Sequence, residues 1–198
     1  MMKSEETASG TKKYLHVGCG RVNPDRIPRR FQTGEWLETR LDIDRRVNPD
    51  IVADIRDLSM IPSESYDAVF SPHNIEHLRY NEVNDALRGF WRVIKPEGFL
   101  VLLVPNLRRV AQIIVDTDID APMMDTTLGP IAPVDVIYGF RPWIQKGNDF
   151  MIHKTGFTPE SLYRRLKENG FNKIVVTVAT SEIPYEHPFN MAAVAYKE

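Results

Sequence analysis

Short apolar runs alternate with amphipathic stretches along this chain. Each apolar run ends at a polar residue after a few positions, which is typical of parallel strands buried on both faces of a sheet. The pattern predicts seven strands, at residues 12–18, 36–43, 50–54, 66–71, 99–104, 171–179 and 191–196.

Two longer stretches have the periodicity of amphipathic helices. The first covers residues 79–95, and Pro96-Glu97-Gly98 is expected to end it. The second covers residues 158–169, where Thr158 is a natural N-cap and Pro159 fits the first helical position. The apolar stripe of the first helix consists of Val83, Leu87, Phe90 and Ile94.

Strands that alternate with helices, followed by a closing hairpin, predict an α/β fold. We expect a Rossmann-like open sheet, mostly parallel, with one antiparallel strand near the C-terminus and helices on both faces. Residues 1–11 are polar and are predicted to be a flexible tail, while residues 12–198 form a single domain.

The stretch at residues 105–150 fits neither periodicity and contains five prolines. Long irregular connections in compact domains often form lids or binding loops. This one leaves the sheet at the carboxyl end of the fifth strand, so we predict a lid or acceptor-binding insertion at about residues 106–152.

Composition narrows the class of protein. The 198 residues carry a formal net charge of −2, which gives no global attraction to nucleic acid or to an anionic membrane. The single cysteine, Cys19, excludes an internal disulfide framework. There is no apolar run long enough to span a bilayer and no signal-peptide pattern, so a cytoplasmic protein is expected.

The most informative segment is Tyr-Leu-His-Val-Gly-Cys-Gly at residues 14–20, an apolar strand that enters a Gly-x-Gly turn. Glycine permits the backbone angles of such a turn and lets a ligand lie against the peptide. Open α/β sheets bind nucleotide-like cofactors at this edge. The dinucleotide fingerprint is incomplete because its third glycine position is Asn23.

Polar residues follow the next strands at the same edge. Asp42 ends the second strand and can accept hydrogen bonds from both hydroxyls of a ribose, with Asp44 as a rival and a solvated loop carboxylate as the alternative. Asp54 ends the third strand, where a turn-capping role is the alternative.

The fourth strand runs into Ser71-Pro72-His73-Asn74, followed by Glu76 and His77. The spacing His73-x-x-Glu76-His77 is similar to an inverted zinc-protease motif. No third ligand is apparent in the sequence, so no metal site is expected.

These motifs and their order resemble the class I S-adenosylmethionine-dependent methyltransferases, and in particular the small type 11 domains. The similarity covers about residues 12–196. The matching segments are LHVGCG at 15–20, RLDID at 40–44, VADIRDLSMIPSESYDAVFSPHNIEHL at 52–78, ALRGFWRVIKPEGFLVLLVPN at 86–106 and HKTGFTPESLYRRLKENGF at 153–171.

The resemblance implies a cofactor, S-adenosyl-L-methionine, and a set of residues that bind it. Asp42 would hold the ribose and Asp54 the adenine amino group, while His73 lies near the reactive methyl. The family usually has an acidic residue where this chain has His16, and Arg21 could compensate by pairing with the cofactor carboxylate. The predicted cofactor-binding residues are His16, Gly18, Cys19, Gly20, Arg21, Asp42, Ile43, Asp54, Ile55, Ser71 and His73.

We therefore expect methyl transfer to an oxygen, nitrogen or carbon nucleophile of a small or medium-sized molecule, with His73 and His153 as candidate proton acceptors. No nucleic-acid or membrane partner is indicated, and the oligomeric state is left open. The alternative is a non-catalytic, methyltransferase-like binding or regulatory subunit, because the first motif is altered and the helices after the first two strands are short or absent. A nicotinamide-dependent enzyme is disfavoured by the missing glycine and by the lack of a Tyr-x-x-x-Lys pair.

Overall fold

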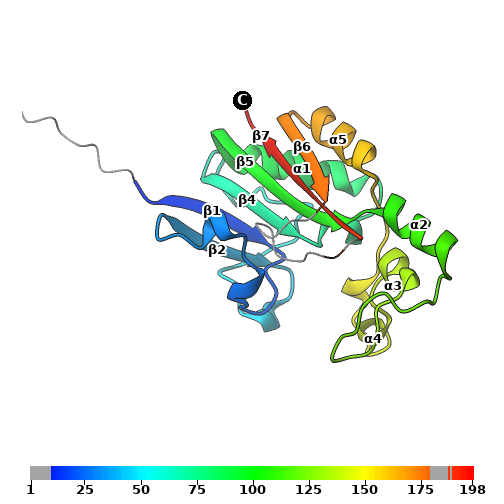
Figure 1. The fold of residues 1–198 in the computed structure, drawn as a ribbon. Helices are drawn as coiled ribbons and strands as arrows, with labels where there is room; N and C mark the ends of the chain where they lie inside the picture. The colour runs from blue at the N-terminus through cyan, green and yellow to red at the C-terminus, as the bar shows by residue number, and fades with distance from the viewer. Residues whose placement is uncertain (1–9, 179–186, 188) are drawn as a thin grey trace, which may run out of the picture.

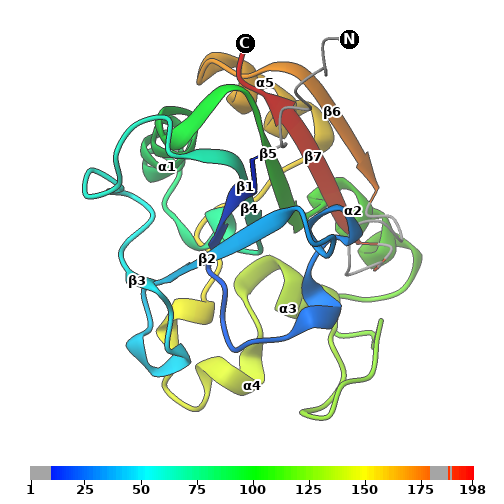
Figure 2. The same ribbon diagram turned by 90° about the vertical axis from the view of Figure 1, so that its left-hand side faces the viewer.

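The computed structural model describes residues 10–178, 187 and 189–198, in which seven strands form one sheet in the order β3-β2-β1-β4-β5-β7-β6 (Figures 1 and 2). Residues 1–9 of the predicted tail lie outside the described residues, and so does residue 179, the predicted end of the sixth strand. The strands are β1 (Lys12–Val17), β2 (Trp36–Asp42), β3 (Ile51–Val52), β4 (Tyr66–Pro72), β5 (Ile94–Pro105), β6 (Asn172–Val178) and β7 (Asn190–Tyr196).

Strand directions confirm the predicted topology. β1 pairs in parallel with β2 and β4, and β4 pairs in parallel with β5. β7 is antiparallel to both of its neighbours, β5 and β6. The parallel strands therefore end at one edge, where the sequence places the glycine turn and the polar residues that follow the strands.

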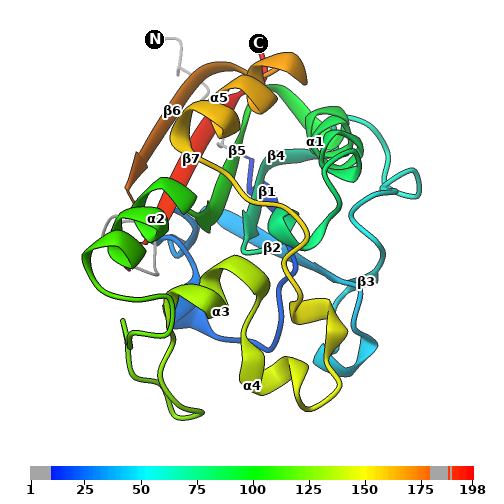
Figure 3. The ribbon, with the colours of Figure 1, turned by 90° about the vertical axis from the view of Figure 1, so that its right-hand side faces the viewer.

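Two amphipathic helices cover one face of the sheet (Figure 3). α1 (Glu82–Val93) and α5 (Pro159–Glu168) bury their apolar stripes against the strands, including Leu87, Phe90 and Leu162, which are fully buried. Thr158 caps α5 as predicted, because its side chain accepts a hydrogen bond from the Ser161 N–H.

The opposite face has a much thinner cover. Two 3-10 helices, η1 (Pro24–Arg26) and η2 (Arg29–Phe31), replace the longer helix that usually follows the first strand of such a sheet. Phe31 stacks on Tyr14 with ring centroids 4.3 Å apart and packs beside Phe70. Helical segments thus lie on both faces, but prolines keep those on this face to single turns.

The predicted end of the first helix is wrong in detail. α1 ends at Val93, and β5 begins at Ile94 and runs through Pro96-Glu97-Gly98 rather than after it. The Glu97 N–H donates to Lys197 O, and the Lys197 N–H donates to Gly98 O. These backbone hydrogen bonds to the last residues of the chain hold Pro96-Glu97-Gly98 in the sheet. Proline is tolerated in a strand where its missing N–H would face no partner.

The insertion is not irregular, contrary to the expectation for residues 106–152. It contains α2 (Leu107–Asp116), α3 (Pro133–Tyr138), α4 (Arg141–Ile144) and the 3-10 helix η5 (Asp149–Met151). Pro133 and Pro142 occupy first-turn positions of α3 and α4, so these prolines start helices instead of breaking them.

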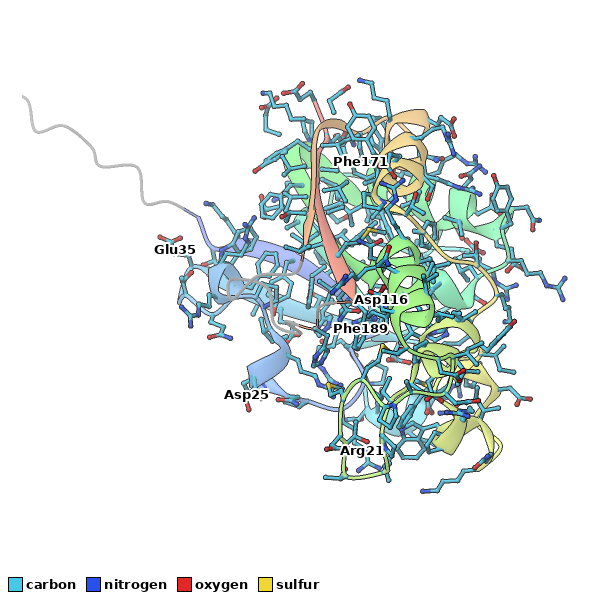
Figure 4. All side chains as sticks on the ribbon, turned by 45° about the vertical axis from the view of Figure 1, so that its right-hand side comes forward. Arg21, Asp25, Glu35, Asp116, Phe171 and Phe189 are labelled. Atoms are coloured by element: carbon cyan, nitrogen blue, oxygen red, sulfur yellow. The ribbon has the colours of Figure 1, made fainter. Side chains whose placement is uncertain are left out.

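A satellite core holds the insertion together. Val110 of α2, Val136 of α3 and Phe189 before β7 are buried against one another, and Figure 4 shows Phe189 beside α2. α3 and α4 lie beyond the carboxyl ends of β4 and β5 (Figures 1 and 3), so the insertion faces the edge that carries the glycine turn. No helix in the described part of the chain is both long enough and apolar enough to cross a membrane.

Candidate functional site

The glycine turn after β1 uses its two glycines differently. Both have left-handed backbones, with φ of +62° at Gly18 and +55° at Gly20. A Cβ at Gly18 would overlap the side-chain amide of Asn74, whereas a Cβ at Gly20 would meet no atom within 4 Å. Gly18 therefore makes room for Asn74, and Gly20 is the point at which a ligand can approach the backbone.

Asn74 joins the ends of β1 and β4, and the sequence analysis did not single it out. Its Nδ2 donates to Val17 O at 2.7 Å and to Pro72 O at 2.9 Å. The buried Ser71 lies next to it, with Oγ 3.4 Å from the same nitrogen. The turn and the fourth strand are thus fixed relative to each other.

Asp42 lies beside the open glycine. One carboxylate oxygen accepts from the Gly20 N–H at 2.9 Å, and the other accepts from the Asp44 N–H at 2.9 Å. Asp44 has a different environment. It caps the 3-10 helix η3 (Arg45–Val47) and forms a bidentate pair with Arg46, which lowers the pKa of its carboxyl group. Of the two candidates, only Asp42 borders the turn.

Arg40 is a second residue that sequence reasoning missed. It lies on β2, and its guanidinium donates to the carbonyls of Gly20 and Asn48, the latter at 2.9 Å. Arg40 therefore ties the glycine turn to the β2–β3 connection. Its position two residues before Asp42 was the available signal, because alternate residues of a strand share a face.

The residues predicted to bind adenine, Asp54 and Ile55, follow β3, and Ile43, a further predicted cofactor-binding residue, follows Asp42 at the end of β2. Ile43 has 44 % of its surface exposed, whereas Ile55 is half-buried against the main core. Asp54 forms a bidentate ion pair with Arg56, and these hydrogen bonds lower the pKa of Asp54. Arg56 also pairs with Glu82 at 2.8 Å. A ligand that reaches Asp54 therefore shares it with a guanidinium.

His16 occupies the position of the acidic residue usual in the family, and it is itself paired with an acid. Its Nδ1 lies 2.7 Å from Glu38 Oε1, and the ring packs on Phe70. Both residues line a cleft of about 450 Å³ between β1–β2 and the segment at residues 22–33. The cleft is on the thinly covered face of the sheet.

Cys19 and Arg21 differ sharply in exposure. Burial raises the pKa of the Cys19 thiol to about 11, so the side chain is a neutral thiol at physiological pH. Arg21 is exposed. Its proposed pairing with a cofactor carboxylate stays a prediction.

His73 is held in an unusual backbone conformation at the end of β4. Its φ is +49°, and its N–H donates to Leu103 O at 2.8 Å. Non-glycine residues with positive φ are uncommon and cluster at functional sites. Its Nδ1 lies 3.2 Å from Oε1 of Glu76, a carboxylate that is 1 % exposed.

His153 lies far from His73 in sequence but close to the same carboxylate. It follows η5 at the end of the insertion, and its ring centroid is 4.8 Å from that of His77. One potential ligand atom from each of Glu76, His77 and His153 lies within 4.8 Å of the others. The structure thus supplies the third residue that the His73-x-x-Glu76-His77 segment lacks.

The sequence was compared with models of protein families and with curated protein sequences. Residues 15–102 match the family model described as a methyltransferase domain. A search of curated protein sequences gives no significant match.

Solved structures share the whole fold. A SAM-dependent methyltransferase from Archaeoglobus fulgidus matches with a TM-score of 0.58 and 17 % identity over 96 % of this chain and 87 % of that one. An S-adenosylmethionine-dependent methyltransferase from Mesorhizobium loti matches with a TM-score of 0.57 and 18 % identity, over 96 % and 92 % of the two chains.

A third match is the Burkholderia thailandensis 1,6-didemethyltoxoflavin-N1-methyltransferase, whose structure contains 1,6-didemethyltoxoflavin and S-adenosylhomocysteine. It has a TM-score of 0.58 and 12 % identity, over 95 % of this chain and 72 % of that one. At these identities the structures establish the fold, and the family match covers the segment from β1 to β5 that carries the glycine turn. The match to a methyltransferase domain over residues 15–102 and the fold shared with solved S-adenosylmethionine-dependent methyltransferases both agree with the resemblance found in the sequence.

Proposed function

We propose that this protein transfers the methyl group of S-adenosylmethionine to an oxygen, nitrogen or carbon nucleophile of a small or medium-sized molecule. The observation that carries the proposal is the pairing of open backbone at Gly20 with the carboxylate of Asp42, 2.9 Å from the Gly20 nitrogen. A carboxylate that can accept from ribose hydroxyls, beside a turn where no side chain blocks a ligand, suits an adenosyl group.

The chain's own residues divide the binding work. Asp42 accepts from the ribose hydroxyls, and Ile43 offers exposed apolar surface next to it for the adenine ring. Ser71 and His73 lie at the end of β4, on the side of the methionine part. S-adenosylmethionine supplies, when bound, an electrophilic methyl group on a sulfonium sulfur.

His73 is the proposed proton acceptor for an acceptor molecule that must lose a proton. An ionised Glu76 can only accept hydrogen bonds, so it favours the tautomer of His73 that carries hydrogen on Nδ1, 3.2 Å away. Nε2 is then the ring atom that takes a proton from the nucleophile. The carboxylate fixes the ring much as an acidic residue orients the base of a catalytic triad.

The insertion supports a small or medium-sized acceptor. α3 and α4 lie beyond the carboxyl ends of the strands and would limit the space available to a polymer. The balanced charge of the chain, with 25 basic and 27 acidic residues, favours neither nucleic acid nor a charged membrane.

Calorimetric titration tests the cofactor. We expect S-adenosylhomocysteine and S-adenosylmethionine to bind with one site per chain and NAD to bind far more weakly. Thermal stabilisation follows the same order, because a ligand that binds only the folded state raises the melting temperature. Stabilisation by NAD alone would refute the proposal.

Turnover tests the role of His73 once labelled S-adenosylmethionine and a panel of phenols, amines and activated carbon acids have identified an acceptor. His73→Ala should lower kcat about a hundredfold and leave S-adenosylhomocysteine affinity within a few-fold. An unchanged kcat would exclude proton transfer by His73. Cofactor binding without methyl transfer to any acceptor would instead favour a non-catalytic binding subunit.

A further inference from the structure

Three side chains from two distant parts of the sequence converge below the carboxyl end of β4. Glu76 and His77 belong to the 3-10 helix η4 (Ile75–His77), and His153 follows η5 at the end of the insertion. Their ligand atoms lie within 4.8 Å of one another. Backbone hydrogen bonds from Lys154 N and Thr155 N to Glu76 O hold the two segments side by side, where the insertion rejoins the domain (Figure 3).

Glu76 is the unusual member because its carboxylate is buried and only half satisfied. The residue is 1 % exposed, Oε1 lies 3.2 Å from His73 Nδ1, and Oε2 has no hydrogen-bond partner among the described residues. Burying a carboxylate oxygen without a partner is costly. A cation next to Oε2 would remove that cost.

The two imidazoles are oriented as metal ligands usually are. His77 Nδ1 lies 3.1 Å from Ile152 O, and His153 Nδ1 lies 2.8 Å from Val136 O. A carbonyl oxygen only accepts, so Nδ1 carries the hydrogen in both rings and Nε2 carries the lone pair. Histidines that bind metal typically donate their other N–H to a carbonyl or carboxylate in this way.

We propose that Glu76, His77 and His153 form a binding site for a divalent transition-metal ion of the zinc type. Two imidazoles and one carboxylate suit Zn²⁺ and its neighbours better than Mg²⁺ or Ca²⁺, which prefer all-oxygen sites. Atoms bound to one such ion at about 2.1 Å lie at most about 4.2 Å apart, so the set closes with small side-chain movements.

The site would have three protein ligands and one open position for water, and it would join the insertion to the end of β4. Glu76 would then use Oε2 for the ion and Oε1 for His73. The proposal goes beyond the proposed function, because the ion can bind whether or not the protein transfers methyl groups.

Metal binding by the full chain tests the site directly. After treatment with a chelator and dialysis, Zn²⁺ titration followed by calorimetry should show one equivalent per chain. Co²⁺ in place of Zn²⁺ should give visible absorption bands typical of a low-coordinate site. Glu76→Gln and His153→Ala should each weaken Zn²⁺ binding about a hundredfold or more. Even the loss of a residue that only hydrogen-bonds to a metal ligand lowers metal affinity about 10–100-fold.

Glu38→Gln is the matched control, because Glu38 is also paired with a histidine but belongs to no group of three potential metal ligands among the described residues. It should bind Zn²⁺ like the wild type. His77→Gln provides a further ligand variant if either of the others fails to fold, as judged by circular dichroism. Absence of binding by the wild type, or equal binding by wild type and all folded ligand variants, would overturn the proposal.

Discussion

Replacement of Asp42 by alanine is the most direct test of how the cofactor is held. In the proposed complex the carboxylate accepts from two ribose hydroxyls, and hydrogen bonds to a charged acceptor contribute about 1.5–3 kcal/mol. Asp42→Ala should therefore weaken S-adenosylhomocysteine binding by at least about tenfold, the loss expected from a single such bond. The turn itself should stay in place, because Arg40 still donates to the Gly20 carbonyl.

Asp44→Ala is the control that separates cofactor contact from stability. Asp42 accepts two backbone N–H groups, and Asp44 accepts the Arg46 N–H and pairs with its guanidinium. Either substitution thus removes hydrogen bonds that contribute about 1 kcal/mol each to the free energy of unfolding. Only Asp42 borders Gly20, so only its loss should change cofactor affinity.

The assay is calorimetric titration of S-adenosylhomocysteine at a temperature well below both melting transitions, with urea unfolding measured in parallel. Comparable stability in the two variants with a large loss of affinity only in Asp42→Ala is the expected result. Equal losses of affinity, or a larger loss in Asp44→Ala, would show that the ribose is not held by Asp42.

Two glycine substitutions, two measurements on Cys19 and a shortened connection test the turn and the insertion. Gly18→Ala should lower the free energy of unfolding by about 2–4 kcal/mol, because it adds left-handed strain and displaces the Asn74 amide. Gly20→Ala adds only the strain and should lower it by about 1–2 kcal/mol. Comparable losses for the two variants in urea unfolding would contradict this. Alkylation of Cys19 at pH 8 should be about a hundredfold slower than in urea, and a native rate close to the denatured one would disprove its burial. Because the folded-state pKa of this thiol, about 11, exceeds its unfolded value, its contribution to stability is complete below about pH 8.5 and falls as the pH rises toward 11, which unfolding at pH 8 and 10.5 can measure. Shortening residues 118–130 should preserve cofactor affinity and abolish methyl transfer, and global unfolding would instead show that this connection belongs to the core.

The sheet could be predicted from sequence because its signals are local. Each strand is a short apolar run, and the antiparallel position of β7 follows from its closeness to β6 in the chain. The helices α3 and α4 of the insertion were missed because proline was interpreted as a helix breaker. Pro133 and Pro142 lie in first turns, where proline is compatible with a helix.

The glycine turn was identified from sequence, but the residues that hold it were not. A long helix normally continues from such a turn, and here only single 3-10 turns follow. Arg40, Asp42 and Asn74 hold the turn from β2 and β4 instead. These contacts join residues 20 to 57 positions apart, which no local pattern encodes.

The histidine cluster shows most clearly where sequence reasoning stops. The spacing of His73, Glu76 and His77 is similar to a metal-binding motif, but no third ligand was apparent in the sequence and no metal site was predicted. His153 completes the set only because β5, the insertion and η5 return the chain to the end of β4. The same return buries Glu76 and thereby leaves Oε2 without a hydrogen-bond partner among the described residues. Burial is therefore what makes this carboxylate informative: an exposed glutamate next to two histidines would be hydrated and would indicate nothing about a ligand.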